Sequence, residues 1–160
     1  MLRTGLGYDS HRFVVGRPLI LAGQQIAFDR GLDGHSDADA VSHAVIDAIL
    51  GAACAGDLGG MFPDTDPRWR GADSLALLRL AREHVAGLGF TVRHVDVTVI
   101  LERPHLGVYK RAMAAALADE LAIDPDHVSI KAKTNEGMGF VGRGEGVAVL
   151  AVATVDGAEL

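Results

Sequence analysis

A polar cluster runs directly into an apolar, periodic segment at Gly34-His35-Ser36-Asp37-Ala38-Asp39-Ala40-Val41-Ser42-His43-Ala44-Val45-Ile46-Asp47. Within it Asp39, His43 and Asp47 recur at four-residue intervals, a spacing that places three side chains on one face of a helix. Ser36, followed three residues later by Asp39, is a weakened capping box that marks a helix start. We therefore expect a helix over about 37–55.

The N-terminal segment adds the groups that this helix face lacks. Asp9 and His11 are two residues apart, so in an extended strand both side chains point to the same side. Together with His43 they give two histidines and one carboxylate, the protein ligands of a zinc site whose fourth position stays open for substrate. Spacing alone leaves two interpretations open, a metal site and an ordinary set of hydrogen-bonded side chains.

Composition limits the class of protein. A chain of 160 residues with 49% hydrophobic residues fits one compact domain spanning 1–160. The net charge of -6, with no long basic run, argues against nucleic-acid binding. The single Cys54 cannot form an internal disulfide, and we expect it to be buried in a reducing compartment. With no apolar signal segment or membrane span, the sequence predicts a cytoplasmic protein without membrane contact.

The remaining pattern predicts an α+β fold, a two-layer sandwich in which helices pack on one face of a mixed β-sheet. The last strand is apolar on both faces, and its second face would meet another subunit, which predicts a homo-oligomer. Besides the helix at 37–55, we expect strands over 2–13, 18–28, 92–101, 128–133 and 146–155, and helices over 73–87 and 108–121.

Four loops carry polar groups whose role the residues alone do not decide. Lys133-Thr134-Asn135-Glu136 offers phosphate donors and one carboxylate for a hydrated magnesium. Arg143 either binds an anion or pairs with Glu145, and the residues favour the ion pair. The loop that carries Asp57, Asp64 and Asp66 is either a sugar-hydroxyl site or a solvated turn. The segment 104–106 reads as a strand-to-helix turn.

Five motifs, in order along the chain, resemble the 2-C-methyl-D-erythritol 2,4-cyclodiphosphate synthase family. The likeness extends from Gly5 to Val152, nearly the whole chain. The motifs are G-x-G-Y-D-x-H-R-F at 5–13, H-S-D-A-D-x-x-x-H at 35–43, G-D-L-G at 56–59, F-P-D-T-D-P at 62–67 and G-F-x-G-R-G-E-G at 139–146.

The resemblance implies a homotrimer with active sites at subunit interfaces, each holding one Zn²⁺, and with Mg²⁺ or Mn²⁺ on the substrate diphosphate. The implied reaction belongs to non-mevalonate isoprenoid biosynthesis. It converts 4-diphosphocytidyl-2-C-methyl-D-erythritol 2-phosphate to the 2,4-cyclodiphosphate and releases CMP. The family likeness leaves open whether a prenyl diphosphate binds at the trimer centre.

The resemblance also assigns residues. Asp9, His11 and His43 would bind zinc, and Glu136 would bind magnesium or manganese through the diphosphate. His35, which orients the attacking group, and Thr134, which contacts phosphate, would be catalytic. Residues expected to contact substrate are Asp9, Ser10, His11, His35, Ser36, Asp57, Leu58, Gly59, Phe62, Pro63, Asp64, Thr65, Asp66, Leu101, Glu102, Arg103, Pro104, His105, Leu106, Gly107, Lys133, Thr134, Asn135, Glu136, Phe140 and Arg143.

The sequence departs from the family pattern at the expected cytidine and phosphate contacts. Lys133 and Asn135 stand in a run that is commonly Thr-Thr-Thr-Glu, and His105 stands where lysine is common. A second proline that usually follows near Gly107-Val108 is absent. Two other functions remain as alternatives: a metal-dependent phosphohydrolase, with Asp39 or Asp47 as general base, and a non-catalytic trimeric ligand-binding module.

Overall fold

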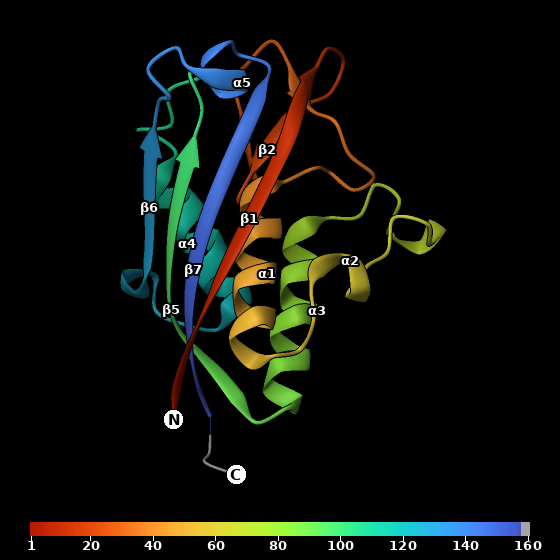
Figure 1. Cartoon of the computed structure of the whole chain (residues 1–160), viewed down its shortest axis with the longest axis vertical. Helices are drawn as coiled ribbons and strands as arrows, with labels where there is room; N and C mark the ends of the chain where they lie inside the picture. Colours follow the sequence, from red (N-terminus) through yellow and green to blue (C-terminus); the bar gives the residue numbers. More distant parts are fainter. Residues whose placement is uncertain (158–160) are drawn as a thin grey trace.

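The computed structural model describes residues 1–157, and its centre is one five-stranded mixed sheet (Figure 1). The strands are β1 (Leu2–Val14), β4 (Gly31–Leu32), β5 (Phe90–Ile100), β6 (Val128–Lys133) and β7 (Gly146–Gly157). Their order across the sheet is β4-β1-β7-β5-β6. Strands β5 and β6 run parallel, and the other neighbouring pairs are antiparallel.

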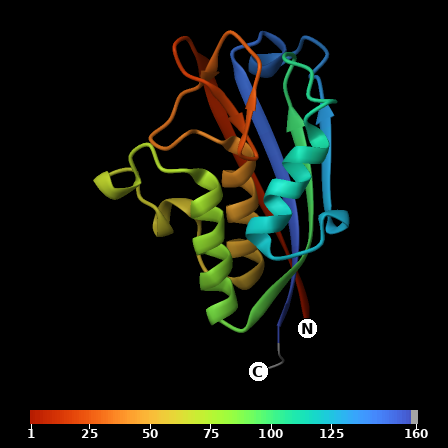
Figure 2. The same ribbon diagram turned by 180° about the vertical axis from the view of Figure 1, so that it is seen from behind.

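Three longer helices cover one face of this sheet and leave the other face open (Figures 1 and 2). They are α1 (Ala40–Ala53), α3 (Ser74–Gly87) and α4 (Lys110–Leu121). Helix α1 packs on β1 and β7, α3 packs on α1, and α4 packs on α3 and β6. This arrangement confirms the predicted fold class, a two-layer α+β sandwich with helices on one face.

Two glycines of β1 explain how α1 can lie so close to the sheet. A Cβ atom at Gly5 would lie 2.1 Å from the carbonyl oxygen of Ala48, and one at Gly7 would lie 1.8 Å from that of Ala44. Any side chain at either position would therefore push the helix away. Residues Asp9 and His11 follow on the same face of the strand, directly beyond this contact.

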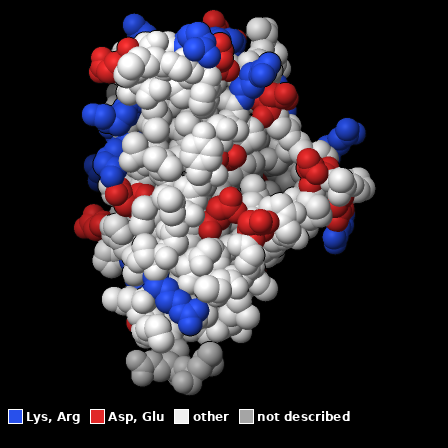
Figure 3. Space-filling model, viewed as in Figure 1, with Lys and Arg blue, Asp and Glu red and all other residues white. Residues whose placement is uncertain are grey.

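The open face of the sheet is apolar along its middle. Leu6 and Tyr8 of β1 are 65% and 52% exposed, and they pair in register with Val152 and Leu150 of β7, each 37% exposed. The charged side chains gather mainly at the margins of this face (Figure 3). The sequence predicted that both faces of the last strand are apolar, and the structure agrees: its alternate residues are buried under the helices, and the others form this surface.

Shorter elements differ from the sequence prediction. The segment 18–28, predicted as one strand, forms a hairpin of β2 (Leu19–Leu21) and β3 (Gln24–Ile26). Two single-turn helices occupy segments predicted as loops, α2 (Leu58–Met61) and α5 (Gly139–Gly142). Helices of four residues are too short to show a hydrophobic period, which explains why the pattern did not reveal them. Two 3₁₀ turns, η1 (Pro67–Trp69) and η2 (Pro125–His127), complete the described elements.

Two local predictions were wrong. The helix predicted from 37 begins at Ala40, and its N-cap is Asp39, whose side chain accepts from the backbone N–H of Val41 and Ser42. Ser36 therefore does not cap it. Cys54 is exposed rather than buried, because it follows the last turn of α1 in a left-handed conformation. Within residues 1–157, no helix is long and apolar enough to cross a membrane.

Candidate metal centre and substrate pocket

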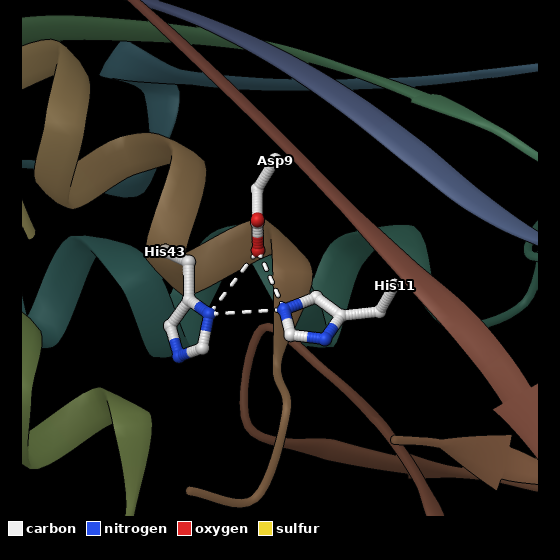
Figure 4. Close-up of side chains that lie close together, drawn as sticks. All are labelled: Asp9, His11 and His43. Carbon is white, nitrogen blue, oxygen red and sulfur yellow. Dashed lines mark hydrogen bonds and ion pairs between the residues drawn. The ribbon is translucent and has the colours of Figure 1, made fainter. Parts of the chain in front are cut away.

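Three side chains from two elements converge at the upper end of α1. The Asp9 Oδ2 atom lies 2.8 Å from His11 Nε2 and 3.1 Å from His43 Nδ1, and these two nitrogens are 3.3 Å apart (Figure 4). Asp9 and His11 come from β1, and His43 comes from the first turn of α1. The three residues form a group that could hold a metal ion, with all donor atoms within 4.8 Å of one another.

The local folding of each element explains this convergence. Alternation along β1 directs Asp9 and His11 toward the helical layer. Asp39 fixes the start of α1, because its fully buried carboxylate also accepts from the backbone N–H groups of Ala22 and Gly23, both at 2.8 Å. With that end anchored, His43 lies one turn into the helix and faces β1.

Asp9 and His11 shift each other's pKa. Burial raises the pKa of the Asp9 carboxyl, but hydrogen bonds and charge from His11 and His43 outweigh burial and leave the pKa below its ordinary value. Burial lowers the pKa of His11, but its hydrogen bond and charge interaction with Asp9 outweigh that effect, and the pKa lies above its ordinary value. Asp9 is thus held as a carboxylate, the form that binds a cation. A metal ion would replace the imidazole protons that this carboxylate accepts, because only a deprotonated ring nitrogen can ligate a metal.

The donor set itself fits a metal. The Nδ1 atom of His11 lies 2.6 Å from the backbone carbonyl oxygen of Asp33, which only accepts, so the ring carries its proton there. Its Nε2 lone pair then faces the group. Two imidazole nitrogens and one carboxylate oxygen are ligands that suit Zn²⁺ with its fourth position open.

The other two acids of the predicted helix face have structural roles. The Asp39 carboxylate accepts five hydrogen bonds, one of them from Ser42 Oγ at 2.8 Å, and burial raises its pKa. Asp47 accepts from the backbone N–H of Leu58 at 2.7 Å, and burial followed by the nearby charges of Asp57 and Asp9 raises its pKa. Asp47 thereby ties α2 to α1.

A cavity of about 300 Å³ opens beside the three converging side chains. Seven residues predicted to contact substrate or metal line it together with His43: Asp9, His11, His35, Ser36, Leu58, Phe62 and Asp64. Trp69 and Leu77 also line it, and sequence analysis did not single them out. In the sequence, Trp69 only follows the polar loop, and Leu77 is one of several leucines in the next helix. Positions of this kind are too common to identify a pocket residue.

Several predicted contacts lie beside this cavity rather than in its wall. Asp57 caps α2 by accepting from the N–H of Gly60 at 2.7 Å, and it lines a separate cavity with Gly60. Asp66 caps η1 and forms an ion pair with Arg68 at 2.6 Å. Gly59, Pro63 and Thr65 complete the same loop without lining the cavity.

A smaller cavity of about 70 Å³ lies where β5 and β6 end. Its lining includes seven predicted substrate contacts: Leu101, Glu102, Pro104, His105, Leu106, Lys133 and Thr134. Arg103, Gly107, Asn135 and Glu136 belong to the same two loops but do not line it. The Glu102 carboxylate accepts from the N–H of Asn135 at 2.7 Å, which joins the two loops.

The Thr134–Glu136 turn places a hydroxyl beside a carboxylate. Thr134 Oγ1 accepts from the Glu136 N–H at 3.3 Å and lies 3.5 Å from Glu136 Oε1. Both side chains are exposed, so they are free to meet a ligand outside the chain's own surface.

Three predicted contacts remain, Ser10, Phe140 and Arg143. Ser10 and Phe140 line another cavity, of about 260 Å³, with His11. Arg143 pairs with Glu145 at 2.7 Å, the contact that the sequence favoured, and both are exposed. Arg143 also lines a further cavity with Arg30.

Comparison with known proteins gives one consistent family. The model of the YgbB family matches residues 2–156. A curated relative from Salinibacter ruber, named 2-C-methyl-D-erythritol 2,4-cyclodiphosphate synthase, is 55% identical over 157 residues, which cover 98% of this chain and 100% of that protein.

Solved structures agree in fold. The bifunctional IspDF from Campylobacter jejuni superposes with a TM-score of 0.95 at 42% identity over 99% of this chain and 43% of that one. A 2C-methyl-D-erythritol-2,4-cyclodiphosphate synthase in a CDP-bound form superposes with a TM-score of 0.88 at 40% identity, over 96% of this chain and 100% of that one. The curated relatives carry the synthase name that the motifs predicted. With matches this extensive in both sequence and fold, the chain belongs to the YgbB family.

Proposed function

We propose that this chain catalyses cyclisation of 4-diphosphocytidyl-2-C-methyl-D-erythritol 2-phosphate. An oxygen of the 2-phosphate forms a bond to the β-phosphorus of the same molecule. The bond from that phosphorus to the oxygen bridging it to the α-phosphorus breaks, and CMP leaves with the electron pair. The product is the 2,4-cyclodiphosphate. The observation that carries this proposal is the convergence of Asp9, His11 and His43 at a cavity that also contains His35 and Ser36, in a chain whose relatives bear the synthase name.

We infer that the converging group holds Zn²⁺ and that Glu136 binds Mg²⁺ or Mn²⁺ through the substrate diphosphate. The mixed nitrogen and oxygen donors support the first assignment, and the lone exposed carboxylate beside Thr134 supports the second. A bound divalent cation supplies a Lewis acid that neutralises phosphate charge and orients phosphate oxygens.

The chain's own residues mainly position the substrate. The attacking phosphate is already an anion, so no serine or cysteine nucleophile is required. The work is to hold two mutually repelling phosphates in line and to surround them with donors. His35, whose Nε2 atom lies 3.4 Å from the Asp66 carbonyl oxygen, orients the attacking phosphate, and the Ser36 hydroxyl lies beside it in the cavity wall. Thr134 offers its hydroxyl to a diphosphate oxygen.

The nucleotide end of the substrate would lie in the cavity formed by 101–107 and 133–134. That cavity and the one beside the metal group share no lining residue. We therefore propose that the active site is completed between subunits of a homotrimer, whose contacts include the open apolar face of the sheet. The exposed Leu6, Tyr8, Leu150 and Val152 support this assembly, because large apolar patches on a surface commonly mark protein interfaces.

The alternative functions have weaker support. A phosphohydrolase needs a general base that can reach water beside the metal, but Asp39 is fully buried and engaged by five donors. Asp47 is engaged by the N–H of Leu58. A structural metal site is normally closed by four protein ligands, and the group here offers three.

Phosphorus NMR of the purified protein with the diphosphocytidyl substrate, zinc and magnesium tests the function. The proposal predicts signals of a cyclic diphosphate and of CMP in equal amounts. Inorganic phosphate as the product would support the phosphohydrolase instead, and an unchanged spectrum would support a binding module.

The predicted cytoplasmic location fits a biosynthetic enzyme and stays a prediction.

A further inference from the structure

The ring of His43 is held from the side opposite the metal group. Its Nε2 atom lies 2.9 Å from Ser74 Oγ and 3.1 Å from Ser36 Oγ. All three side chains are buried: Ser74 is 0% exposed, His43 7% and Ser36 8%. Ser74 is the first residue of α3 and comes 31 residues after His43 in the chain. The start of α3 is thus in direct contact with a residue of the metal group.

The Ser74 hydroxyl can only accept from His43. Its single proton is donated to Asp37 Oδ1, and its backbone N–H donates to Asp37 Oδ2 at 3.0 Å. Asp37 is itself held by the backbone N–H of Asp39 at 3.1 Å. A hydroxyl has one proton to donate, so the atom between Ser74 Oγ and His43 Nε2 must be the imidazole proton.

Ser36 alone does not determine whether the Nε2 atom of His43 carries a proton. It accepts from the N–H of Ala38 at 3.2 Å, but its own proton is not directed to a carboxylate. It could therefore donate to His43 or accept from it. Only the pair of Ser74 and Asp37 requires the proton to lie on Nε2.

We propose that Ser74 and Asp37 are positioning residues that fix the tautomer and orientation of His43, so that its Nδ1 lone pair faces Asp9 and His11. The inference rests on the proposed metal site. With this tautomer, the Asp9 Oδ2, His11 Nε2 and His43 Nδ1 atoms all present lone pairs to one ion. The Asp33 carbonyl fixes the tautomer of His11 in the same way. Partners of this kind hold metal-binding histidines in one tautomer and raise their basicity.

Anchoring α3 does not account for the Ser74 hydroxyl. The N-cap of α3 is Asp73, whose side chain accepts from the N–H of Leu75 at 3.0 Å. The Ser74 backbone N–H already reaches Asp37 without help from the hydroxyl. A substitution that removes only the hydroxyl should therefore change the metal site more than the helix.

Zinc competition titrations on the full-length protein test this proposal. Ser74→Ala should weaken zinc binding by about 10- to 100-fold, the range for residues that orient metal ligands. Ser74→Thr, which keeps a hydroxyl, should recover most of the affinity. Ser42→Ala is the matched control: Ser42 is equally buried in the neighbouring helix, but its hydroxyl donates to Asp39 and has no hydrogen bond with a residue of the metal group. Its zinc affinity should stay within about twofold of the wild type.

A spectroscopic measurement separates positioning from general destabilisation. The visible absorption of the cobalt-loaded protein reports ligand geometry, so it should change in Ser74→Ala and return in Ser74→Thr. If Ser74→Ala keeps both its zinc affinity and its cobalt spectrum, the proposal is overturned. If that variant does not fold, Asp37→Asn decides instead, because it removes the charge that binds the Ser74 proton. Weaker zinc binding then supports the proposal, and unchanged binding contradicts it.

These readouts need no turnover. A wild type that binds zinc and responds to Ser74→Ala, but makes no cyclic product, would contradict the proposed reaction and leave the positioning role intact. If the wild type makes the cyclic product while Ser74→Ala binds zinc normally, the proposed reaction is supported and the positioning role is contradicted.

Discussion

At the scale of single residues, His43 has both ring nitrogens engaged. Its Nδ1 atom faces Asp9 and His11, while Nε2 contacts two buried hydroxyls. A side chain fixed at both ends loses little freedom when it binds an ion, so this residue should contribute strongly to metal affinity.

We expect His43→Ala to weaken zinc binding by more than about 100-fold, beyond the effect of residues that only orient ligands. Most activity should disappear with the metal, while far-ultraviolet circular dichroism stays native because α1 keeps its other buried residues. Metal analysis after dialysis measures the loss. His94→Ala, at an exposed position of β5, is the control. Full zinc occupancy in His43→Ala would refute the assignment.

A second residue-scale prediction concerns Lys133 and His105, which line the same small cavity. As a hypothesis, Lys133 supplies the positive charge that a lysine at position 105, common in the family pattern, would provide. Lys133→Thr should weaken substrate binding by about 1–3 kcal/mol, the range for hydrogen bonds to charged groups. Adding His105→Lys should restore part of the loss, because both side chains would serve one anion. Steady-state kinetics decide: an unchanged KM in Lys133→Thr would rule out this compensation.

The sequence revealed the metal residues better than their supports. Asp9, His11 and His43 follow strand and helix periods that can be read without coordinates. Asp39 shares the period of His43, but it lies before the first helical turn, so it became a cap instead. The roles of Asp37 and Ser74 depend on how α3 packs against α1, a tertiary contact that no local spacing encodes.

At the scale of elements, the close contact of β1 with α1 sets the geometry of the site. Gly7→Ala would place a methyl group 1.8 Å from the Ala44 carbonyl oxygen, and neither backbone can yield without moving the helix. The free energy of unfolding should fall by about 1–3 kcal/mol or more, the cost of overpacking. Zinc affinity should fall as well, because His43 moves with α1.

Urea denaturation at fixed protein concentration measures this effect. Gly51→Ala in α1, the helix that Gly7 contacts, is the control, because a methyl group there meets nothing within 4 Å. Its stability should stay the same or rise by up to about 1 kcal/mol, since alanine favours helix over glycine. Equal stability of the two variants would contradict the role given to the β1–α1 contact.

The layered arrangement could be predicted from the sequence because its long strands and helices repeat their periods several times. The hairpin of β2 and β3 was missed, since its turn at Ala22 and Gly23 adopts left-handed conformations and is fixed by the distant Asp39. The two cavities could not be predicted as separate sites. Their separation depends on the strand order, which places β1 and β6 apart in the sheet.

At the scale of the whole molecule, the open sheet face should decide assembly. Leu6→Glu introduces a charge at an apolar position that pairs in register with Val152. Burying an unpaired carboxylate is unfavourable, so the variant should dissociate and lose activity. Light scattering measures the mass, and the wild type should have that of a trimer. Leu88→Glu, at another exposed leucine, the C-cap of α3, should keep the trimer. A trimeric Leu6→Glu variant would place the interface elsewhere.

In the proposed reaction the substrate's own phosphate, and not water, attacks the β-phosphorus. Turnover in ¹⁸O-enriched water, followed by mass spectrometry of both products, tests it directly. Neither CMP nor the methylerythritol product should gain a heavy oxygen, because every oxygen of both products comes from the substrate. One ¹⁸O atom in either product would show that water attacked phosphorus and would contradict the cyclisation mechanism.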